Sequence, residues 1–337
     1  MKPIQVCFPI ERDLEEWTAR FDAGEAPSRW PYGLEGLASG APGFLRPLSR
    51  TAALAGWARS ALPRSSRGAA ALVWDENTAM RLTPAGGRRR YAGVIWLTDR
   101  DPHTVASRKQ RAWLSRFDGL WVLSDAQVEP LRRLLGPRAP RISYVRFGID
   151  TDFFRPAPYP SVPRILSVGG DRDRDAATLF AALERVLARH PGLEVTVQTT
   201  SALSPPRGVR VVPRLTHAEL RREYEAAGLV MLATRPNLHV SGMTVSLEAM
   251  ATARPVVVTS SPGMADYVRA GTDGILVPQG DAAALAAGAE RLLAAPEQAA
   301  AWGRQARERV ESEFTTHALC ARLARVVGAD PEVGTHQ

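Results

Sequence analysis

The stretch LVMLATRPNLHVSGMTVSLEAMATARPVVVT, residues 229–259, carries the strongest fold signal in the sequence. Its apolar runs at 229–233 and 255–259 predict two buried strands, because parallel strands that are covered on both faces are apolar throughout. Between them, a polar loop with one glycine leads into a predicted helix over 244–251. The stretch therefore predicts a strand–helix–strand unit of a parallel sheet.

The same alternation continues through the C-terminal half of the chain. It begins after a proline-rich linker at 155–163, since proline stiffens a chain and cannot donate to a β ladder. Further strands are predicted at 164–168, 194–198, 209–212 and 274–277, and further helices at 179–187, 218–227, 264–270 and 282–293. Helices between successive strands indicate a parallel sheet that is covered on both faces.

The N-terminal half shows a looser form of this pattern. Strands are predicted at 4–8, 71–74, 94–97, 120–123 and 142–145, and helices at 12–22, 52–62, 105–117 and 127–135. The predicted fold class is therefore α/β, with two doubly wound, Rossmann-like domains. Such domains place a ligand cleft where they face each other, outside the carboxyl ends of the strands.

Composition narrows the classes of protein that fit. Of the 337 residues, 45% are hydrophobic, yet no apolar run approaches the roughly 18 residues that a membrane-spanning helix needs. The N-terminus lacks the long apolar core and the cleavage site of a signal peptide. We therefore expect a cytoplasmic protein in which Cys7 and Cys320 are buried thiols.

The positive charge lies in the N-terminal half. Residues 1–160 contain 24 Lys and Arg against 16 Asp and Glu, whereas residues 161–337 contain 19 of each. Residues 36–74 hold five arginines and no acidic residue, and such a field attracts anions. The predicted helix at 52–62 fits peripheral contact with an anionic membrane, and it equally fits an ordinary amphipathic helix. Nucleic acid is not expected as a partner, because the chain has no recognition motif for it.

The loop and helix start at 239–248 form the most informative candidate site. Backbone N–H groups at a helix start bind anions, and Gly242 lets a phosphate come close. Glu248 lies one turn along the predicted helix, where it can accept hydrogen bonds from ribose hydroxyls. In the alternative interpretation, Ser241 or Thr244 only caps the helix and Glu248 faces solvent.

This segment resembles the signature of the GT-B retaining glycosyltransferases, in particular glycosyltransferase family 4. In that family, Glu-Gly-Phe-Gly and four further residues precede Glu-Ala-Met-Ala, and Pro-Val-Val follows; the matching residues here are 240–251 and 255–257. Residues 147–156, 260–281 and 302–314 resemble other family segments in the same order. The resemblance covers residues 118–327 well and residues 1–117 poorly.

The resemblance implies a GT-B fold with two domains. The N-terminal domain, residues 1–157, would bind the acceptor and would be joined by a C-terminal helix at 315–337. The C-terminal domain, residues 158–314, would bind the nucleotide sugar.

The resemblance also implies roles for individual residues. Glu248 matches the glutamate that binds the nucleotide ribose. Arg174 and Arg172 match the basic pair that grips the donor diphosphate and stabilises the leaving nucleotide, which a metal does in other enzymes. Alternatively, the three aspartates of loop 169–175 neutralise both arginines locally. The other implied donor-binding residues are Gly170, Arg214, Leu215, Ser241, Gly242, Met243 and Thr244.

Three positions depart from the family pattern. Val240 stands where the family has the first glutamate of its signature, which contacts the donor sugar; His239 or Ser241 is a candidate substitute. The glycine-rich loop after the first strand is missing, and Gly33 is a candidate replacement. Where the family often has His-Asp, this chain has Thr-Asp, and Asp99 is a candidate polar group near the acceptor.

The implied activity is that of a biosynthetic hexosyltransferase. It would move a sugar from a UDP- or GDP-linked donor to an acceptor hydroxyl with retention of anomeric configuration. The acceptor is expected to be a small-molecule natural product or a saccharide. The alternatives are a lipid-linked acceptor at the inner face of the membrane, or a protein that binds nucleotide sugar without normal transfer. The family needs no essential divalent ion, so we expect no metal, no cluster of metal ligands and no cofactor besides the co-substrate.

Overall fold

The computed structural model describes residues 3–49, 51, 55, 69–83, 88–162 and 164–328. The chain divides into two compact units, each with its own parallel sheet. The N-terminal unit comprises Met1–Trp17, Trp30–Arg146 and Thr316–Gln337, and the C-terminal unit comprises Thr18–Arg29 and Phe147–Thr315.

The predicted helix at 52–62 lies, except for Ala55, outside the described residues. All four arginines expected around it, Arg50, Arg59, Arg64 and Arg67, also lie outside the described residues. Within the described ranges, no helix is long and apolar enough to cross a membrane.

The sheet of the N-terminal unit has six parallel strands in the order β2-β1-β3-β4-β5-β6. Its strands are β1 (Ile4–Pro9), β2 (Gly43–Leu45), β3 (Ala70–Val73), β4 (Arg89–Gly93), β5 (Gly119–Val122) and β6 (Arg141–Tyr144). The inner strands β3 and β5 are buried along their whole length, as expected for a parallel sheet that is covered on both faces. The two edge strands are β2 and β6.

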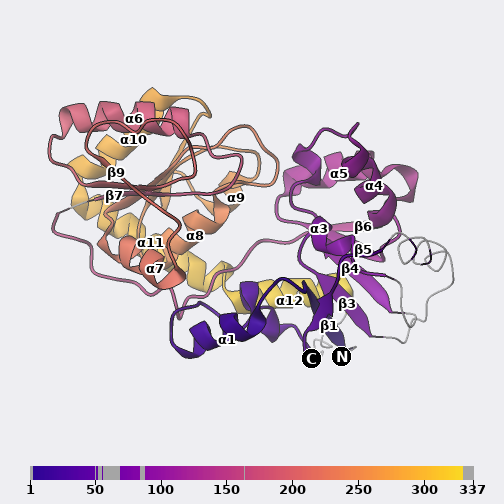
Figure 1. Cartoon of the computed structure of the whole chain (residues 1–337). Helices are drawn as coiled ribbons and strands as arrows, with labels where there is room; N and C mark the ends of the chain where they lie inside the picture. Colours follow the sequence, from indigo (N-terminus) through magenta and orange to yellow (C-terminus); the bar gives the residue numbers. More distant parts are fainter. Residues whose placement is uncertain are drawn as a thin grey trace, which may run out of the picture. The chain divides into compact units, whose positions relative to one another are not determined.

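Helices surround this sheet, and the last one comes from the far end of the chain (Figure 1). Cys320 on this helix donates from Sγ to the carbonyl of Gly33 at 3.3 Å, and the Tyr91 hydroxyl donates to the carbonyl of Val327 at 3.3 Å. Cys7 and Cys320 are both buried, as predicted. The helical elements are α1 (Leu14–Asp22), which continues into the C-terminal unit, η1 (Pro31–Gly36), α3 (Glu76–Ala79), η2 (Leu97–Asp99), α4 (Val105–Leu114), η3 (Asp125–Gln127), α5 (Val128–Leu135), η4 (Gly136–Arg138) and α12 (Thr316–Val327).

The strand predicted at 94–97 is wrong, because β4 runs over Arg89–Gly93 instead. The apolar segment that follows it is buried but leaves the ladder, since the buried Glu76 carboxylate accepts the backbone N–H groups of Ile95 and Trp96, both at 2.9 Å. Arg90 can occupy a buried strand position because its guanidinium lies over the ring of Phe117 and donates to the carbonyl of Arg116. The Glu76 carboxylate therefore takes Ile95 and Trp96 out of the sheet, and the Phe117 ring and the Arg116 carbonyl allow Arg90 to be buried in it.

The C-terminal unit also has six parallel strands, in the order β12-β11-β10-β7-β8-β9. Helices α6 and α10 cover one face and helices α8 and α11 the other (Figure 1), so the predicted α/β class with two parallel sheets is confirmed. The elements are β7 (Ile165–Val168), α6 (Ala176–Arg189), β8 (Val195–Gln198), β9 (Val209–Val212), α7 (His217–Ala226), β10 (Leu229–Leu232), α8 (Met243–Ala251), β11 (Val256–Thr259), α9 (Met264–Tyr267), β12 (Gly274–Val277), α10 (Ala282–Ala294) and α11 (Pro296–Glu313).

The buried side chain of Arg254 ties the proline-rich linker to this unit. Its guanidinium donates to the carbonyls of Ala157 at 3.0 Å and Pro158 at 2.8 Å, and also to those of Tyr224 and Glu225 at 3.1 and 2.7 Å. Burial of an arginine costs less free energy when its donors have partners, and here main-chain oxygens accept from the guanidinium. The linker is thereby held against the unit that contains the candidate site.

Candidate functional site

The candidate site lies where strands β7 and β10 end. These strands are neighbours in the sheet, so the loops that follow them meet at its carboxyl edge. Asp175 donates its backbone N–H to the carbonyl of Ala233 at 3.0 Å, and Arg235 donates to the carbonyl of Asp173 at 2.8 Å. These bonds join loop 169–175 to loop 233–242 and fix the position of the side chains between them.

Arg174 lies between the two loops, with Nε and Nη1 buried. Neither atom has a hydrogen-bond partner among the described residues. Burial lowers the pKa of this guanidinium, while the charge of Asp171 and the neighbouring Tyr224 and Glu248 act in the opposite direction. Buried guanidinium donors without partners are costly, and an anion bound beside them would satisfy them.

Two glycines make room for this guanidinium. A Cβ on Gly169 would clash with Nε of Arg174, and a Cβ on Gly242 would lie 2.8 Å from Nη1. Gly242 also has φ +102°, a backbone conformation that disfavours side chains, and it is the N-cap residue of α8. Glycine at these two positions therefore leaves the space that the Arg174 side chain occupies next to the start of α8.

Glu248 on α8 is buried rather than solvent-facing, with 7% of its surface exposed. The Tyr224 hydroxyl on α7 donates to its Oε2 at 2.7 Å. Burial raises the pKa of Glu248 to about 7, although the Tyr224 hydrogen bond and the charge of Arg174 both lower it. The alternative in which Ser241 or Thr244 caps the helix is wrong, because no side chain caps α8.

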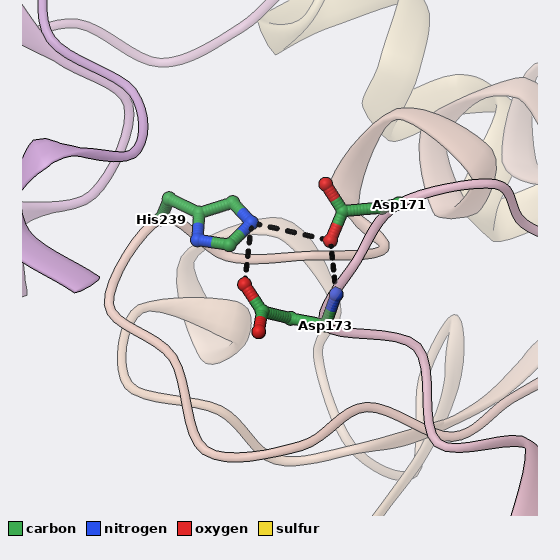
Figure 2. Close-up of side chains that lie close together, drawn as sticks. All are labelled: Asp171, Asp173 and His239. Atoms are coloured by element: carbon green, nitrogen blue, oxygen red, sulfur yellow. Dashed lines mark hydrogen bonds and ion pairs between the residues drawn. The ribbon is translucent and has the colours of Figure 1, made fainter. Parts of the chain in front are cut away.

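A second cluster lies on the same loops, and Figure 2 shows its three side chains. His239 Nε2 lies 3.4 Å from Oδ1 of Asp171 and 3.7 Å from Oδ2 of Asp173. Oδ1 of Asp171 also accepts from the Ser241 hydroxyl at 2.8 Å and from the backbone N–H of Asp173 at 2.9 Å. Burial raises the pKa of Asp171, but these hydrogen bonds and the charge of His239 lower it further than burial raises it. We call Asp171, Asp173 and His239 the acid–histidine cluster.

The acid–histidine cluster has the chemistry of a cation site. One ligand atom from each residue lies within 4.8 Å of the others, and imidazole with carboxylate oxygens suits several divalent metals. The expectation that the chain has no cluster of metal ligands is therefore wrong. The signal was present in the sequence as the Asp-x-Asp spacing of Asp171 and Asp173. That no ion is required for activity stays a prediction.

The other predicted residues are distributed more widely. Arg172 is exposed and pairs with Asp173 at 3.1 Å, so the local neutralisation considered for both arginines applies to Arg172. Leu215 donates its backbone N–H to Oε1 of Gln198 at 3.0 Å, at the end of β8. Four further predicted positions lie in the C-terminal unit, namely exposed Gly170 and Arg214, buried Met243 and half-buried Thr244. Asp99 belongs to the other unit, at the end of η2.

Val240 holds a left-handed backbone conformation, with φ 55°. A β-branched residue rarely adopts this conformation, and such strain persists only where the surroundings impose it. Here the next residue, Ser241, donates its N–H to Oδ1 of Asn237 at 2.9 Å, and Val240 itself is buried. The backbone conformation of Val240, the position that departs from the family signature, is therefore held by the loop around it.

Comparison with known proteins gives these observations a context. Residues 163–295 match the family described as Glycosyl transferases group 1. The chain is 28% identical to glycogen synthase of Mycobacterium tuberculosis over 266 residues, which is 74% of this chain and 62% of that protein. It is 29% identical to D-inositol 3-phosphate glycosyltransferase 2 of Catenulispora acidiphila over 240 residues, covering 62% of this chain and 55% of the relative. The chain thus spans less than two thirds of the length of these relatives.

Two solved structures share the fold over nearly the whole chain. The crystal structure of Anabaena HepE in complex with UDP and glucose has a TM-score of 0.69 at 14% identity, covering 98% of this chain and all of that one. Sucrose-phosphate synthase from Thermosynechococcus elongatus has a TM-score of 0.66 at 17% identity, covering 97% and 98% of the two chains. The GT-B fold that the sequence predicts is thereby confirmed.

Proposed function

We propose that the chain is a glycosyltransferase, on the basis that residues 163–295 match the family described as Glycosyl transferases group 1. It would take a nucleotide-diphosphate sugar as donor and transfer the sugar to an acceptor hydroxyl with retention of configuration. The observation that carries the proposal is the buried guanidinium of Arg174, whose Nε and Nη1 have no partner among the described residues.

The proposed donor site follows from the chemistry of these groups. A diphosphate beside Arg174 would satisfy the unpartnered donors and would also meet the N-terminus of α8, where backbone N–H groups favour anions. When the bond to the sugar breaks, negative charge grows on the leaving diphosphate. A guanidinium already held in place stabilises that charge without reorganisation. Arg174 would therefore contribute to catalysis as well as to binding.

Glu248 would bind the ribose of the donor. One of its carboxylate oxygens accepts from Tyr224, and the carboxylate can accept further hydrogen bonds from ribose hydroxyls. A protonated carboxyl accepts such bonds less well than a carboxylate. Because burial raises the pKa of Glu248 to about 7, donor binding should strengthen as the pH rises through neutrality.

The remaining parts of the proposal concern the acceptor and the cofactors. We place Asp99 of the N-terminal unit near the acceptor, which we take to be a small-molecule natural product or a saccharide. A lipid-linked acceptor is kept as the alternative, on the positive charge of the N-terminal half. No cofactor besides the UDP- or GDP-linked donor is proposed.

A second candidate function is a protein that binds a nucleotide sugar without transferring it. It is favoured by Val240, which supplies no polar side chain where the family has a glutamate, and by His239, which is held by two aspartates. Release of nucleoside diphosphate separates the two candidates. Incubation of each bound donor with a panel of saccharide and small-molecule hydroxyl acceptors, followed by chromatography, would show acceptor-dependent release only for the transferase.

The donor site is tested by a thermal-shift screen of UDP, GDP, ADP and TDP and their common sugars. A ligand at about 100 times its dissociation constant adds roughly 2.7 kcal/mol to the free energy of unfolding. One nucleotide should stabilise the wild type and the control Arg185→Met, whose arginine is exposed on α6, but neither Arg174→Met nor Glu248→Gln. The assignment fails if no nucleotide stabilises the wild type, or if all four proteins respond alike.

A further inference from the structure

A second concentration of positive charge lies in the N-terminal unit. Between Glu129 and Asp150 the sequence has five arginines and no acidic residue. Helix α12, which belongs to the same unit, adds Arg322 and Arg325, again without an acidic residue. Edge strand β6 contributes to the first run, so the two sets of arginines belong to elements of one unit.

The structure places part of this charge around a cavity. Residues of β6 and α12 line a cavity of about 330 Å³, and four of the lining side chains are arginines. A neighbouring cavity of about 530 Å³ shares Arg141 with the first and is also lined by Arg132 and Arg133. Among the described residues, no acidic side chain lines either cavity. The arginines of the first cavity are Arg141, Arg146, Arg322 and Arg325.

The arginines differ in how far their charges are already compensated. Arg132 and Arg133 both pair with Glu129, at 2.5 and 3.9 Å. Arg322 donates from Nη1 to the main-chain carbonyl of Arg146 at 3.2 Å, which holds its side chain beside the cavity.

Arg141 and Arg325, in contrast, are exposed, and the side chain of neither has a hydrogen bond or an ion pair within the described part of the chain. Two guanidinium groups at the mouth of one cavity are thus available to a ligand.

We propose that the cavity between β6 and α12 binds a phosphate group, carried either by a soluble phosphorylated molecule or by a lipid headgroup. Guanidinium groups bind phosphate oxygens through paired, charge-assisted hydrogen bonds, which suits a site built from arginines. The volume lies at the lower end of the range for small-molecule sites, so it fits a headgroup or a sugar phosphate rather than a large ligand. All the residues that line this cavity belong to the N-terminal unit, whereas Arg174 and Glu248 belong to the C-terminal unit.

The test uses the full chain and two matched double variants. Arg141→Glu with Arg325→Glu reverses the charge at the cavity. Arg185→Glu with Arg207→Glu makes the same change in net charge at exposed arginines of the C-terminal unit. All four positions are exposed, so both variants should fold, and circular dichroism checks this.

The probes separate the two sources of phosphate. Inorganic phosphate and glycerol 3-phosphate serve as soluble ligands, and vesicles of phosphatidylglycerol with phosphatidylcholine are compared with phosphatidylcholine alone. Binding is followed as hydrogen-exchange protection of peptides covering β6 and α12. We expect protection in the wild type and in the control, and an affinity at least tenfold weaker in the cavity variant.

Protection by the soluble probes identifies a phosphorylated small molecule, and protection by anionic vesicles alone identifies a lipid headgroup. Absence of protection by every probe overturns the proposal, as does equal loss in both double variants, which would indicate an effect of net charge. Nucleotide stabilisation, measured in parallel, should be unchanged in both variants. Its absence from the wild type would count against the donor site and not against this cavity.

Discussion

Replacement of Glu248 by glutamine should change how the stability of the C-terminal unit depends on pH. Glu248 is buried, and its pKa rises from the ordinary 4.5 to about 7 in the folded chain. The folded state therefore binds a proton that the unfolded chain has already released at neutral pH. Stability from this group is fully present below pH 4.5 and is lost as the pH rises to about 7.

The magnitude follows from the two pKa values. A rise from 4.5 to about 7 corresponds, at about 1.4 kcal/mol per pH unit, to about 3 kcal/mol of unfolding free energy. Glutamine has nearly the same shape and does not titrate. The unfolding free energy of Glu248→Gln minus that of the wild type should therefore grow by about 3 kcal/mol between pH 4 and pH 8.

Native-state hydrogen exchange of peptides from α8 measures this difference, because it reports the opening of one region without assuming that both units unfold together. Wild type and Glu248→Gln are compared at each pH, so the intrinsic pH dependence of exchange cancels. The acidic side chain of Glu184 on α6 is exposed, and Glu184→Gln serves as the control. Identical pH dependence in wild type and Glu248→Gln would refute the reasoning.

Three further predictions concern the same site. Tyr224→Phe removes the hydroxyl that donates to Glu248 and should destabilise the C-terminal unit by roughly 1–3 kcal/mol. Hydrogen exchange of peptides from α8 measures this, and unchanged exchange there would contradict the prediction. Gly242→Ala brings a Cβ to 2.8 Å from Nη1 of Arg174 and should abolish nucleotide stabilisation in the thermal-shift assay. The control Gly40→Ala, whose added Cβ meets no atom within 4 Å, should leave it unchanged; equal responses would contradict this. Treatment with EDTA should leave donor turnover unchanged if the acid–histidine cluster acts through charge alone, and loss of turnover that Zn²⁺ or Mg²⁺ restores would assign it a metal.

The fold class could be predicted from the sequence, but the exact bounds of the strands could not. Alternating apolar runs and helical periods give the α/β class, because a parallel sheet covered on both faces requires them. The strand at 94–97 could not be placed this way. Its apolar residues are buried, but the N–H groups of Ile95 and Trp96 bond to Glu76 rather than to a strand. Whether a residue is buried and whether its main chain is hydrogen-bonded in a sheet are separate properties, and a run of apolar residues indicates only burial.

In the candidate site, too, some residues could be predicted from the sequence and their contacts could not. Glu248 could be selected from its place on the predicted helix, and Arg174 through the resemblance to a family, but the burial of Glu248 and of the Nε and Nη1 atoms of Arg174 could not be foreseen. Tyr224 carries no motif, and it reaches Glu248 only because α7 packs near α8. Asp171 and His239 are 68 residues apart and meet because β7 and β10 are neighbouring strands. Pairings of this kind depend on sheet order, which the sequence pattern leaves open.

The central claim is that the buried guanidinium of Arg174 holds the diphosphate of a nucleotide donor. Calorimetric titration tests it directly, with the nucleotide that stabilises the wild type titrated into wild type, Arg174→Met and the control Arg185→Met. Two charge-assisted hydrogen bonds at about 1.5 kcal/mol each predict binding about 100-fold weaker in Arg174→Met and unchanged in the control. Equal affinity in Arg174→Met and the wild type would contradict the claim.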